Sequence, residues 1–334
     1  MRICVFGAGA IGSYMGANLA MAGHTVTLVA RGPHLAALRD GGVRIVEHGG
    51  DTHTVRTSVA GSDETLPAQD AVLVTLKGHE VPAAVLPLAR LARGGAAMVF
   101  IQNGLPWWYF RDLPGPLGGK AFTCVDPDGV LWRTLDPTSV LGAVVKIGAE
   151  IVAPGTVKHD GDGTAAQQFM LGELDGRRSD RVQAIAAAAD GAGIATEITP
   201  HIRTEIWAKL LINLFASSLG TLTEATSDIV SSDPGLRPIV TGLATEGYRV
   251  AQAVGADLKP SHLDMIVSRW RAPRHRTSML QDYLARRTLE IDPIIRAVAE
   301  LGDLVGIDTP LVDTVLALVI VKARFAGLYP QDVP

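Results

Sequence analysis

The sequence predicts an α/β protein, in which an N-terminal doubly wound parallel sheet is followed by an all-α domain. Three observations lead to this prediction. Short apolar runs alternate with helical segments in the first half of the chain, and a glycine-rich turn follows the first of these runs. After Pro200 only helical patterns remain. Alternating strands and helices are typical of βαβ units with right-handed crossovers.

The individual elements follow from local pattern. Runs rich in Val, Ile and Leu predict buried strands at 3–6, 25–29, 71–76 and 96–101, with helices at 10–22 and 81–93 between them. Residues 121–173 contain Pro and Gly turns typical of short strands, and a helix at 181–190 and a strand at 195–199 follow.

Six helices are expected after this point, several with Pro in the first turn. They are residues 201–222, 238–254, 260–268, 277–289, 293–305 and 310–325. The change of pattern divides the chain into domains 1–199 and 200–334, in agreement with the roughly two domains that a length of 334 residues predicts.

Composition excludes several classes of partner. The chain has 30 Lys and Arg against 34 Asp and Glu, with no long run of one sign, so the basic stripe of a nucleic-acid-binding protein is absent. No segment reaches the roughly 18 uninterrupted apolar residues that cross a bilayer, so no membrane partner is expected. Two cysteines make no disulfide framework, which favours a cytoplasmic location. No cluster with metal-ligand spacing occurs, so no metal is expected.

The glycine-rich turn predicts a dinucleotide-binding, Rossmann-type domain. Gly7, Gly9 and Gly12 form the pattern GxGxxG, with Ala8, Ala10 and Ile11 between them, directly after a strand and at the start of a helix. The first glycine allows the tight turn, the second lets the backbone approach the pyrophosphate, and the third permits close packing of helix on strand. A turn with only a structural purpose is the alternative.

The end of the second strand bears on the choice of cofactor. An NAD site usually has an acid about 20 residues after the glycines, whereas this chain has Val29, Ala30 and Arg31 there. The guanidinium of Arg31 suits a 2′-phosphate by charge and by its fork of donors, so NADP(H) is favoured over NAD(H). A solvated surface arginine is the alternative.

Other polar residues lie where a ligand could bind. Lys77 and Asn103 follow the third and fourth predicted strands, and open α/β sheets bind ligands at the carboxyl ends of their strands. On the apolar helix 201–222, Lys209, Asn213 and Ser217 recur every four residues and share one face. Such a stripe indicates a wet surface, with a structural ion pair to an acid of the other domain as the alternative.

Two further segments carry polar residues. Thr277 or Ser278 is expected to cap the helix at 277–289, and capping is the simpler interpretation of Ser278. Asp292 before Pro293 is typical of a helix cap, which leaves Glu290 as an unexplained acid in an apolar neighbourhood. The aromatic segment 107–109 is either a substrate wall or, more commonly, part of a core.

With these motifs the chain resembles the ketopantoate reductases (2-dehydropantoate 2-reductases) over nearly its whole length. The resemblance depends jointly on residues 7–12, 74–77, 102–104, 153–159, 207–213 and 278–282, with Glu290 twelve residues after Ser278. It implies NADPH-dependent reduction of a 2-keto acid, most simply 2-dehydropantoate to (R)-pantoate, on a Rossmann-type domain followed by a helical one.

The resemblance also implies roles for individual residues. Lys209 would be the general acid, and Glu290 a second catalytic group near the cofactor. Cofactor binding would fall to residues 7–12, Arg31, Lys77, Asn103, Ala149 and Glu290. Substrate binding would fall to Asn103, Lys209, Asn213, Ser217 and Ser278. The chain departs from the family at residues 217–220, where an asparagine is usual, and in a longer segment between Asn103 and Ala149 that carries Trp107 and Trp108.

Two other functions stay open at this stage. One is a reductase of a different branched or aromatic 2-keto acid, which Ser217 and the tryptophans would serve. The other is an NADP-binding regulator without turnover, although a protein that only binds the cofactor needs neither Lys209 nor Glu290. The expected partner is a small-molecule 2-keto acid, and a homodimer is an open alternative to a monomer.

Overall fold

The computed structural model describes residues 1–159, 168–269 and 274–331, and the chain forms two compact units. Unit 1 consists of Met1–Gln102, Phe110–Ala121 and Asp128–Ile202. Unit 2 consists of Asn103–Tyr109, Phe122–Pro127 and Arg203–Pro334. Two short segments from the first half of the chain therefore belong to the helical unit, which a division of the sequence at residue 199 does not show.

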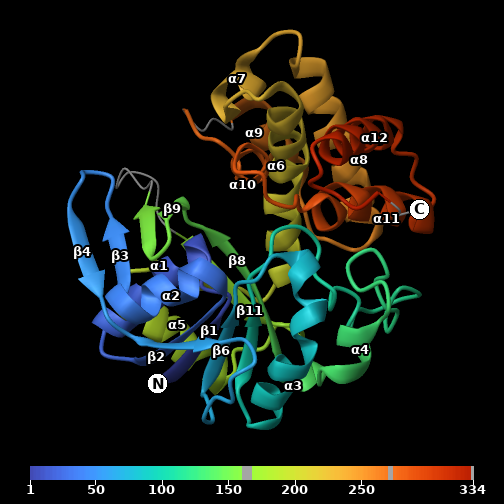
Figure 1. Ribbon diagram of the computed structural model, residues 1–334. Coiled ribbons are helices and arrows are strands. Elements are labelled where there is room, and N and C mark those ends of the chain that lie inside the picture. Colours follow the sequence, from blue (N-terminus) through green and yellow to red (C-terminus); the bar gives the residue numbers. More distant parts are fainter. Residues whose placement is uncertain (160–167, 270–273, 332–334) are drawn as a thin grey trace. The chain divides into compact units, whose positions relative to one another are not determined.

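Unit 1 is built on an eight-stranded sheet with the order β12-β11-β8-β7-β6-β1-β2-β5 (Figure 1). Its strands are β1 (Arg2–Phe6), β2 (Thr25–Ala30), β5 (Ser58–Gly61), β6 (Ala71–Val74), β7 (Ala97–Phe100), β8 (Val140–Lys146), β11 (Gln168–Glu173) and β12 (Thr196–Ile198). All neighbours are parallel except β8 and β11. The strand order reverses between β1 and β6, so the doubly wound sheet is confirmed.

The four strands expected in the first half are present with shifted ends. β6 stops at Val74, before the predicted end at residue 76, although the Thr75 N–H still bonds to the Phe6 carbonyl oxygen at 3.0 Å. Leu76 and Lys77 then leave the sheet and lead into the short helix η1 (Gly78–Glu80). This exit places Lys77 beyond the carboxyl edge of β6.

Both faces of the large sheet are covered. Ile3 and Val5 point into a core shared with α1 (Ala10–Met21) and α5 (Asp180–Gly191). Phe6 points to the opposite face, where it lies near Pro87 and Leu91 of α3 (Val85–Arg93). The remaining helices of unit 1 are α2 (Gly32–Gly41), η2 (Pro82–Ala84), α4 (Val130–Thr134) and η3 (Pro137–Ser139).

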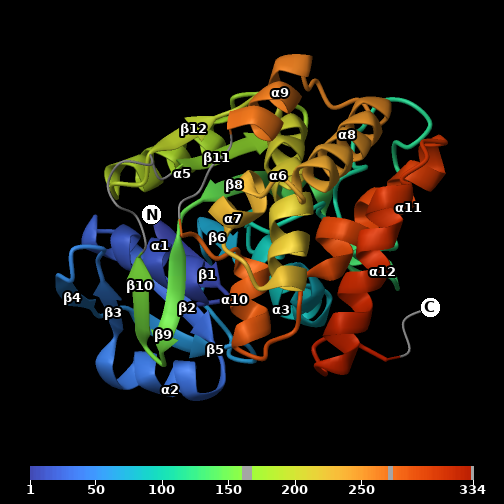
Figure 2. The ribbon, with the colours of Figure 1, turned by 90° about the horizontal axis from the view of Figure 1, so that it is seen from above.

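A second sheet of four strands, in the order β4-β3-β10-β9, packs against α1 (Figure 2). Its strands are β3 (Val43–Val46), β4 (Thr52–Val55), β9 (Ala149–Ala153) and β10 (Thr156–His159). The sequence predicts short strands after residue 121, but not β3 and β4. The rings of Tyr14 and His159 stack with centroids 4.5 Å apart, which joins the small sheet to α1.

Unit 2 is helical in its described residues. Its helices are α6 (Ile202–Thr223), α7 (Ser227–Ser232), α8 (Arg237–Ala253), α9 (Pro260–Arg269), α10 (Ser278–Leu284), α11 (Ala297–Val305) and α12 (Pro310–Phe325). The expected helix at 277–289 is wrong beyond Leu284, because Arg286 takes a positive φ of 57° that ends the helix. The expected helix at 293–305 begins with π-helical geometry, over Asp292–Arg296.

α6 passes a length and hydropathy test for a membrane-spanning helix, the one helix to do so in the described parts of the chain. Within its most apolar stretch, 67% is buried inside the fold, as in the core helix of a globular protein.

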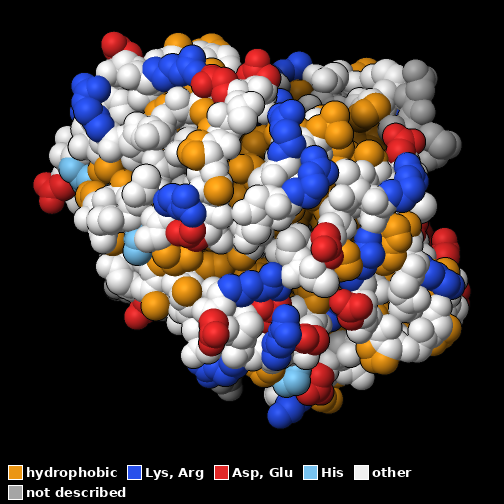
Figure 3. All heavy atoms as spheres, turned by 90° about the horizontal axis from the view of Figure 1, so that it is seen from below, with side chains coloured by type: hydrophobic (Ala, Val, Ile, Leu, Met, Phe, Trp, Pro, Cys, Tyr) orange, Lys and Arg blue, Asp and Glu red, His pale blue; other side chains and the backbone are white. Residues whose placement is uncertain are grey.

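On the face drawn in Figure 3, Lys and Arg side chains are interspersed with Asp and Glu.

Candidate active site

The glycine-rich turn in unit 1 is shaped by its own packing at two of its three glycines. Gly7 has a φ of 109°, and a Cβ there would lie 2.8 Å from the Leu76 nitrogen. A Cβ on Gly12 would lie 2.4 Å from the Gly7 carbonyl oxygen and 2.6 Å from Thr75 Oγ1. The fold itself therefore requires glycine at both positions.

Gly9 is different, because a Cβ there would meet only the Gly7 carbonyl oxygen, at 4.0 Å. Its φ of −73° suits any residue, and it caps α1 without a side-chain hydrogen bond. The first turn of α1 carries no acidic residue, so its exposed amides can receive an anion. The turn thus fits a dinucleotide pyrophosphate. A bound pyrophosphate would account for glycine at position 9, where the protein's own packing would also accept a larger residue.

Substitution of Gly9 and of Gly12 separates ligand binding from folding. Gly9→Ala should leave the melting temperature unchanged and weaken NADPH binding by about tenfold or more, since the methyl group occupies the approach to the amides. Gly12→Ala should instead lower the free energy of unfolding by about 1–3 kcal/mol, through overpacking. Thermal unfolding and cofactor titration of both variants make the comparison. Equal loss of stability in the two would contradict the assignment of Gly9 to the ligand.

Arg31 lies at the end of β2, as predicted, and is the residue before α2. Its side chain is 79% exposed and forms an ion pair with Glu80 of η1. Lys77 precedes η1, and its backbone N–H donates to Glu80 Oε2 at 3.1 Å. Ala149 begins β9 in the small sheet, which packs against α1.

His34 is a residue of this region that sequence reasoning missed. Its Nδ1 accepts a hydrogen bond from the Gly155 N–H at 3.0 Å, and its Nε2 lies 3.3 Å from Ser13 Oγ. Burial lowers the pKa of the imidazole, which favours the neutral ring. From the start of α2, His34 thus contacts both α1, the helix that follows the glycine-rich turn, and the turn between β9 and β10. Sequence spacing contains no signal for this contact.

In unit 2, three of the predicted site residues come together. Lys209 Nζ on α6 donates a hydrogen bond to Asn103 Oδ1 at 2.7 Å. Asn103 Nδ2 in turn donates to Glu290 Oε2 at 3.4 Å. Lys209 and Asn103 are partly exposed, and Glu290 is 5% exposed. A cation, an amide and a carboxylate therefore form a short chain in which the Asn103 amide bridges the two charged groups.

A backbone contact holds Asn103 in this chain. The Leu105 N–H donates to the Pro293 carbonyl oxygen at 2.8 Å, inside the π-helical turn that follows Glu290. Gly104 has a φ of 76°, and a Cβ there would lie 2.1 Å from the same oxygen. Glycine is thus required for the segment after β7 to lie against the residues that follow Glu290.

The other predicted substrate residues differ in their exposure. Asn213 is partly exposed one turn after Lys209, whereas Ser217, a further turn on, is 1% exposed. Ser278 is exposed, and Thr277 caps α10 by accepting from the Leu280 N–H. The interpretation of Ser278 as the cap is therefore wrong.

Two other expectations in unit 2 are settled by burial and pairing. Trp107 and Trp108 are 3% and 1% exposed, so both belong to the core. Asp292 does not cap the helix: its carboxylate accepts from Arg296 Nε at 2.9 Å and from the Tyr329 hydroxyl at 2.5 Å. This ion pair supports the π-helical turn on which Gly104 packs.

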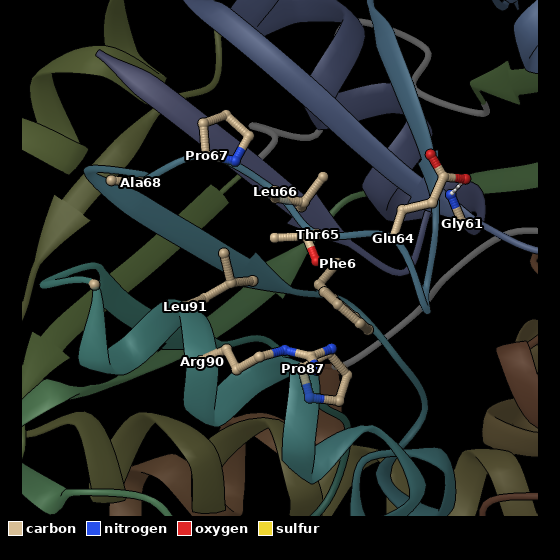
Figure 4. Close-up of a pocket in the computed structure, with 11 residues that line it drawn as sticks. Phe6, Gly61, Glu64, Thr65, Leu66, Pro67, Ala68, Pro87, Arg90 and Leu91 are labelled. Carbon is tan, nitrogen blue, oxygen red and sulfur yellow. Dashed lines mark hydrogen bonds between the residues drawn. The ribbon is translucent and has the colours of Figure 1, made fainter.

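A pocket of about 150 Å³ in unit 1 lies elsewhere, beneath the segment 64–68 and beside α3. Figure 4 shows Phe6, Pro67, Leu91 and Arg90 around it. Its lining includes none of the predicted site residues. Most of its lining residues are exposed or partly exposed, so it is an open depression between the segment 64–68 and α3.

Comparison with known proteins gives consistent matches over both units. The family model described as "Ketopantoate reductase PanE/ApbA" matches residues 3–107, and its C-terminal counterpart matches residues 201–323. The 2-dehydropantoate 2-reductase of Mesorhizobium japonicum is 38% identical, over 98% of this chain and 100% of that protein. The enzyme of the same name from Halobacterium salinarum is 30% identical, over 97% and 99%.

Solved structures agree. A crystal structure described as that of a candidate ketopantoate reductase from Ralstonia solanacearum MolK2 superposes with a TM-score of 0.88, at 35% identity, over 98% of this chain and 99% of that one. A ternary structure of D-mandelate dehydrogenase with NADH and anilino(oxo)acetate has a TM-score of 0.83 over 98% of this chain and 100% of that one. Its identity of 19% shows a common fold alone.

Proposed function

Since the chain belongs to the ketopantoate reductase family, we propose that it reduces 2-dehydropantoate to (R)-pantoate with NADPH, with Lys209 as the general acid. An oxidoreductase that reduces 2-keto acids is what the family membership itself supports. The observation that carries the finer proposal is the hydrogen-bonded chain of Lys209, Asn103 and Glu290.

The reaction needs two things at the keto carbon and its oxygen. When bound, NADPH supplies the hydride that adds to C2. The oxygen of the keto group then develops negative charge, which a proton donor must neutralise. The ammonium of Lys209 would supply both a positive charge and the proton. The products are the 2-hydroxy acid, the oxidised cofactor and a neutral amine, which takes up a proton again from solvent.

Asn103 sets the direction in which Lys209 points. Its Oδ1 accepts a hydrogen bond from one of the three N–H groups of the ammonium, and its Nδ2 donates to Glu290. The amide is thereby fixed by a donor on one side and an acceptor on the other. The ammonium carries three protons, one of which would be donated to the substrate oxygen, and no rotation of Asn103 is needed when the substrate binds.

Glu290 contributes through its charge and its burial. Its buried carboxylate accepts a hydrogen bond from the Asn103 amide and so keeps the oxygen of that amide directed at Lys209. Asn213, one turn from Lys209 on the same face of α6, and Ser278 at the start of α10 would hold the substrate carboxylate by neutral donors. Ser217 is 1% exposed, and its assignment to the substrate stays a prediction.

Most of the proposed cofactor-binding residues belong to unit 1, while Asn103 and Glu290 of unit 2 keep their assignment to the cofactor as a prediction. The amides at the start of α1 would bind the pyrophosphate, Arg31 the 2′-phosphate, and Lys77 a further part of the dinucleotide. The assignment of Ala149 to the cofactor stays a prediction. A cytoplasmic location and a homodimer also stay predictions. A reductase of aromatic 2-keto acids has less support than 2-dehydropantoate reduction, because Trp107 and Trp108 are core residues.

The proposal is tested by turnover. The purified chain should consume NADPH, followed by the loss of its near-ultraviolet absorbance, with 2-dehydropantoate and with a panel of branched and aromatic 2-keto acids. 2-Dehydropantoate should give the highest kcat/KM. An aromatic 2-keto acid with a higher kcat/KM would show that the preferred substrate is not 2-dehydropantoate. No turnover with any 2-keto acid of the panel would favour an NADP-binding regulator without catalytic activity.

A further inference from the structure

Arg31 and Glu80 form an ion pair across two loops of unit 1. Arg31 follows β2, and Glu80 lies in the loop after β6, 49 residues along the chain. The arginine side chain is 79% exposed, whereas that of Glu80 is 22% exposed. The guanidinium that the charge pattern assigns to a 2′-phosphate is therefore already in contact with an acid.

The carboxylate of Glu80 is the better fixed of the two partners. One of its oxygens accepts from Arg31, and the other accepts from the Lys77 N–H at 3.1 Å. The Glu80 N–H also donates to the Lys77 carbonyl oxygen at 2.9 Å, which closes η1 on itself. Backbone contacts thus hold Glu80 in place, while Arg31 reaches it from solvent.

We propose that Glu80 is a specificity-determining residue that narrows the preference of this chain for NADPH over NADH. The inference rests on the proposed function, because it takes Arg31 to lie at the 2′ position of the adenosine ribose. An acid at that position is the usual feature of NAD sites, where it accepts a hydrogen bond from the ribose 2′-hydroxyl. Here the acid comes from a different loop than the one in which sequence patterns place it.

The two cofactors meet this pair differently. A 2′-phosphate carries up to two negative charges near neutral pH, so it must take Arg31 from Glu80 and then remain close to the displaced carboxylate. A 2′-hydroxyl needs no such exchange, because a carboxylate that already accepts two hydrogen bonds retains further lone pairs. Glu80 therefore opposes NADPH and supports NADH, while Arg31 does the reverse.

The test is cofactor titration of the whole chain, followed by fluorescence or calorimetry and without substrate. Glu80→Gln keeps an oxygen for the Lys77 N–H but removes the charge. The ratio of Kd for NADH to Kd for NADPH should rise by about threefold to tenfold, a range set by the solvent exposure of the pair. Arg31→Ala should lower the same ratio, by weakening NADPH alone.

Glu64→Gln is the matched control. Glu64 pairs with Arg39 in the same unit, with both side chains about half exposed, and the substitution changes the net charge by the same amount. The ratio of Kd for NADH to Kd for NADPH should be the same in the Glu64→Gln variant as in the unaltered chain. If Glu80→Gln behaves like this control while Arg31→Ala still weakens NADPH selectively, the role of Glu80 is wrong and the proposed function stands. If the unaltered chain binds neither cofactor, the proposed function fails and the role of Glu80 fails with it.

Discussion

Lys209→Met should lower kcat by about 10²–10⁴ and leave the melting temperature unchanged or raised. Methionine keeps the length and the apolar stem of lysine but removes the proton and the charge. The keto oxygen then loses its proton donor at the moment its charge develops. NADPH affinity should change little, because the glycine-rich turn belongs to unit 1 and Lys209 to unit 2. Steady-state kinetics and thermal unfolding on the same preparation provide both readouts.

A purely structural lysine predicts the opposite pattern. Removal of one partner from a buried ion pair typically costs about 3–5 kcal/mol, because the other charge stays buried without compensation. Lys322→Met is a suitable control in the same unit: Lys322 Nζ donates to the Leu222 carbonyl oxygen and to Glu224, both at 3.0 Å. It should lose some stability and keep its kcat. A Lys209→Met variant that is clearly destabilised yet turns over normally would refute the catalytic role.

Gly104→Ala is expected to lower the free energy of unfolding by about 2–4 kcal/mol, from a positive φ and an overpacked contact together. The added Cβ would lie 2.1 Å from the Pro293 carbonyl oxygen, so the segment after β7 must move away from the π-helical turn. That movement displaces Asn103 from Lys209 and Glu290. In the molecules that stay folded, kcat should fall by about 10², the usual effect of a misplaced catalytic geometry.

Gly306→Ala separates the two contributions to this loss. Gly306 has a φ of 71°, close to the 76° of Gly104, and a Cβ there would meet nothing within 4 Å. It should cost about 1 kcal/mol, from backbone strain alone, and leave kcat unchanged. Urea unfolding and steady-state kinetics of both variants give the comparison. If Gly104→Ala is as stable and as active as Gly306→Ala, the contact with Pro293 does not position Asn103.

Several elements of the site could be predicted from sequence because their physics is local. The glycine-rich turn is a pattern of six consecutive residues, and its position after a strand is evident from an apolar run. The face shared by Lys209 and Asn213 follows from the 3.6-residue period of one helix. The four parallel strands were found for the same reason, with errors only at their ends, where side-chain pattern does not determine which backbone groups still pair.

Other features depended on which distant segments meet, and there sequence reasoning failed or was silent. Asn103 follows a strand of unit 1 but belongs to unit 2, because Gly104 and Leu105 pack on the Pro293 carbonyl oxygen. His34 and the β3–β4 pair gave no recognisable signal.

The ion pair of Arg31 and Glu80 illustrates the same limit. Sequence spacing looks for an acid after β2, where this chain has Arg31, and only the fold brings Glu80 to Arg31 from the loop after β6. The sequence alone determined the family, the position of the glycine-rich turn and the residue types of the proposed site. The tertiary structure decided which of those residues touch, since hydrogen bonds between segments tens to hundreds of residues apart are set by packing and strand register, and neither is encoded in a local pattern.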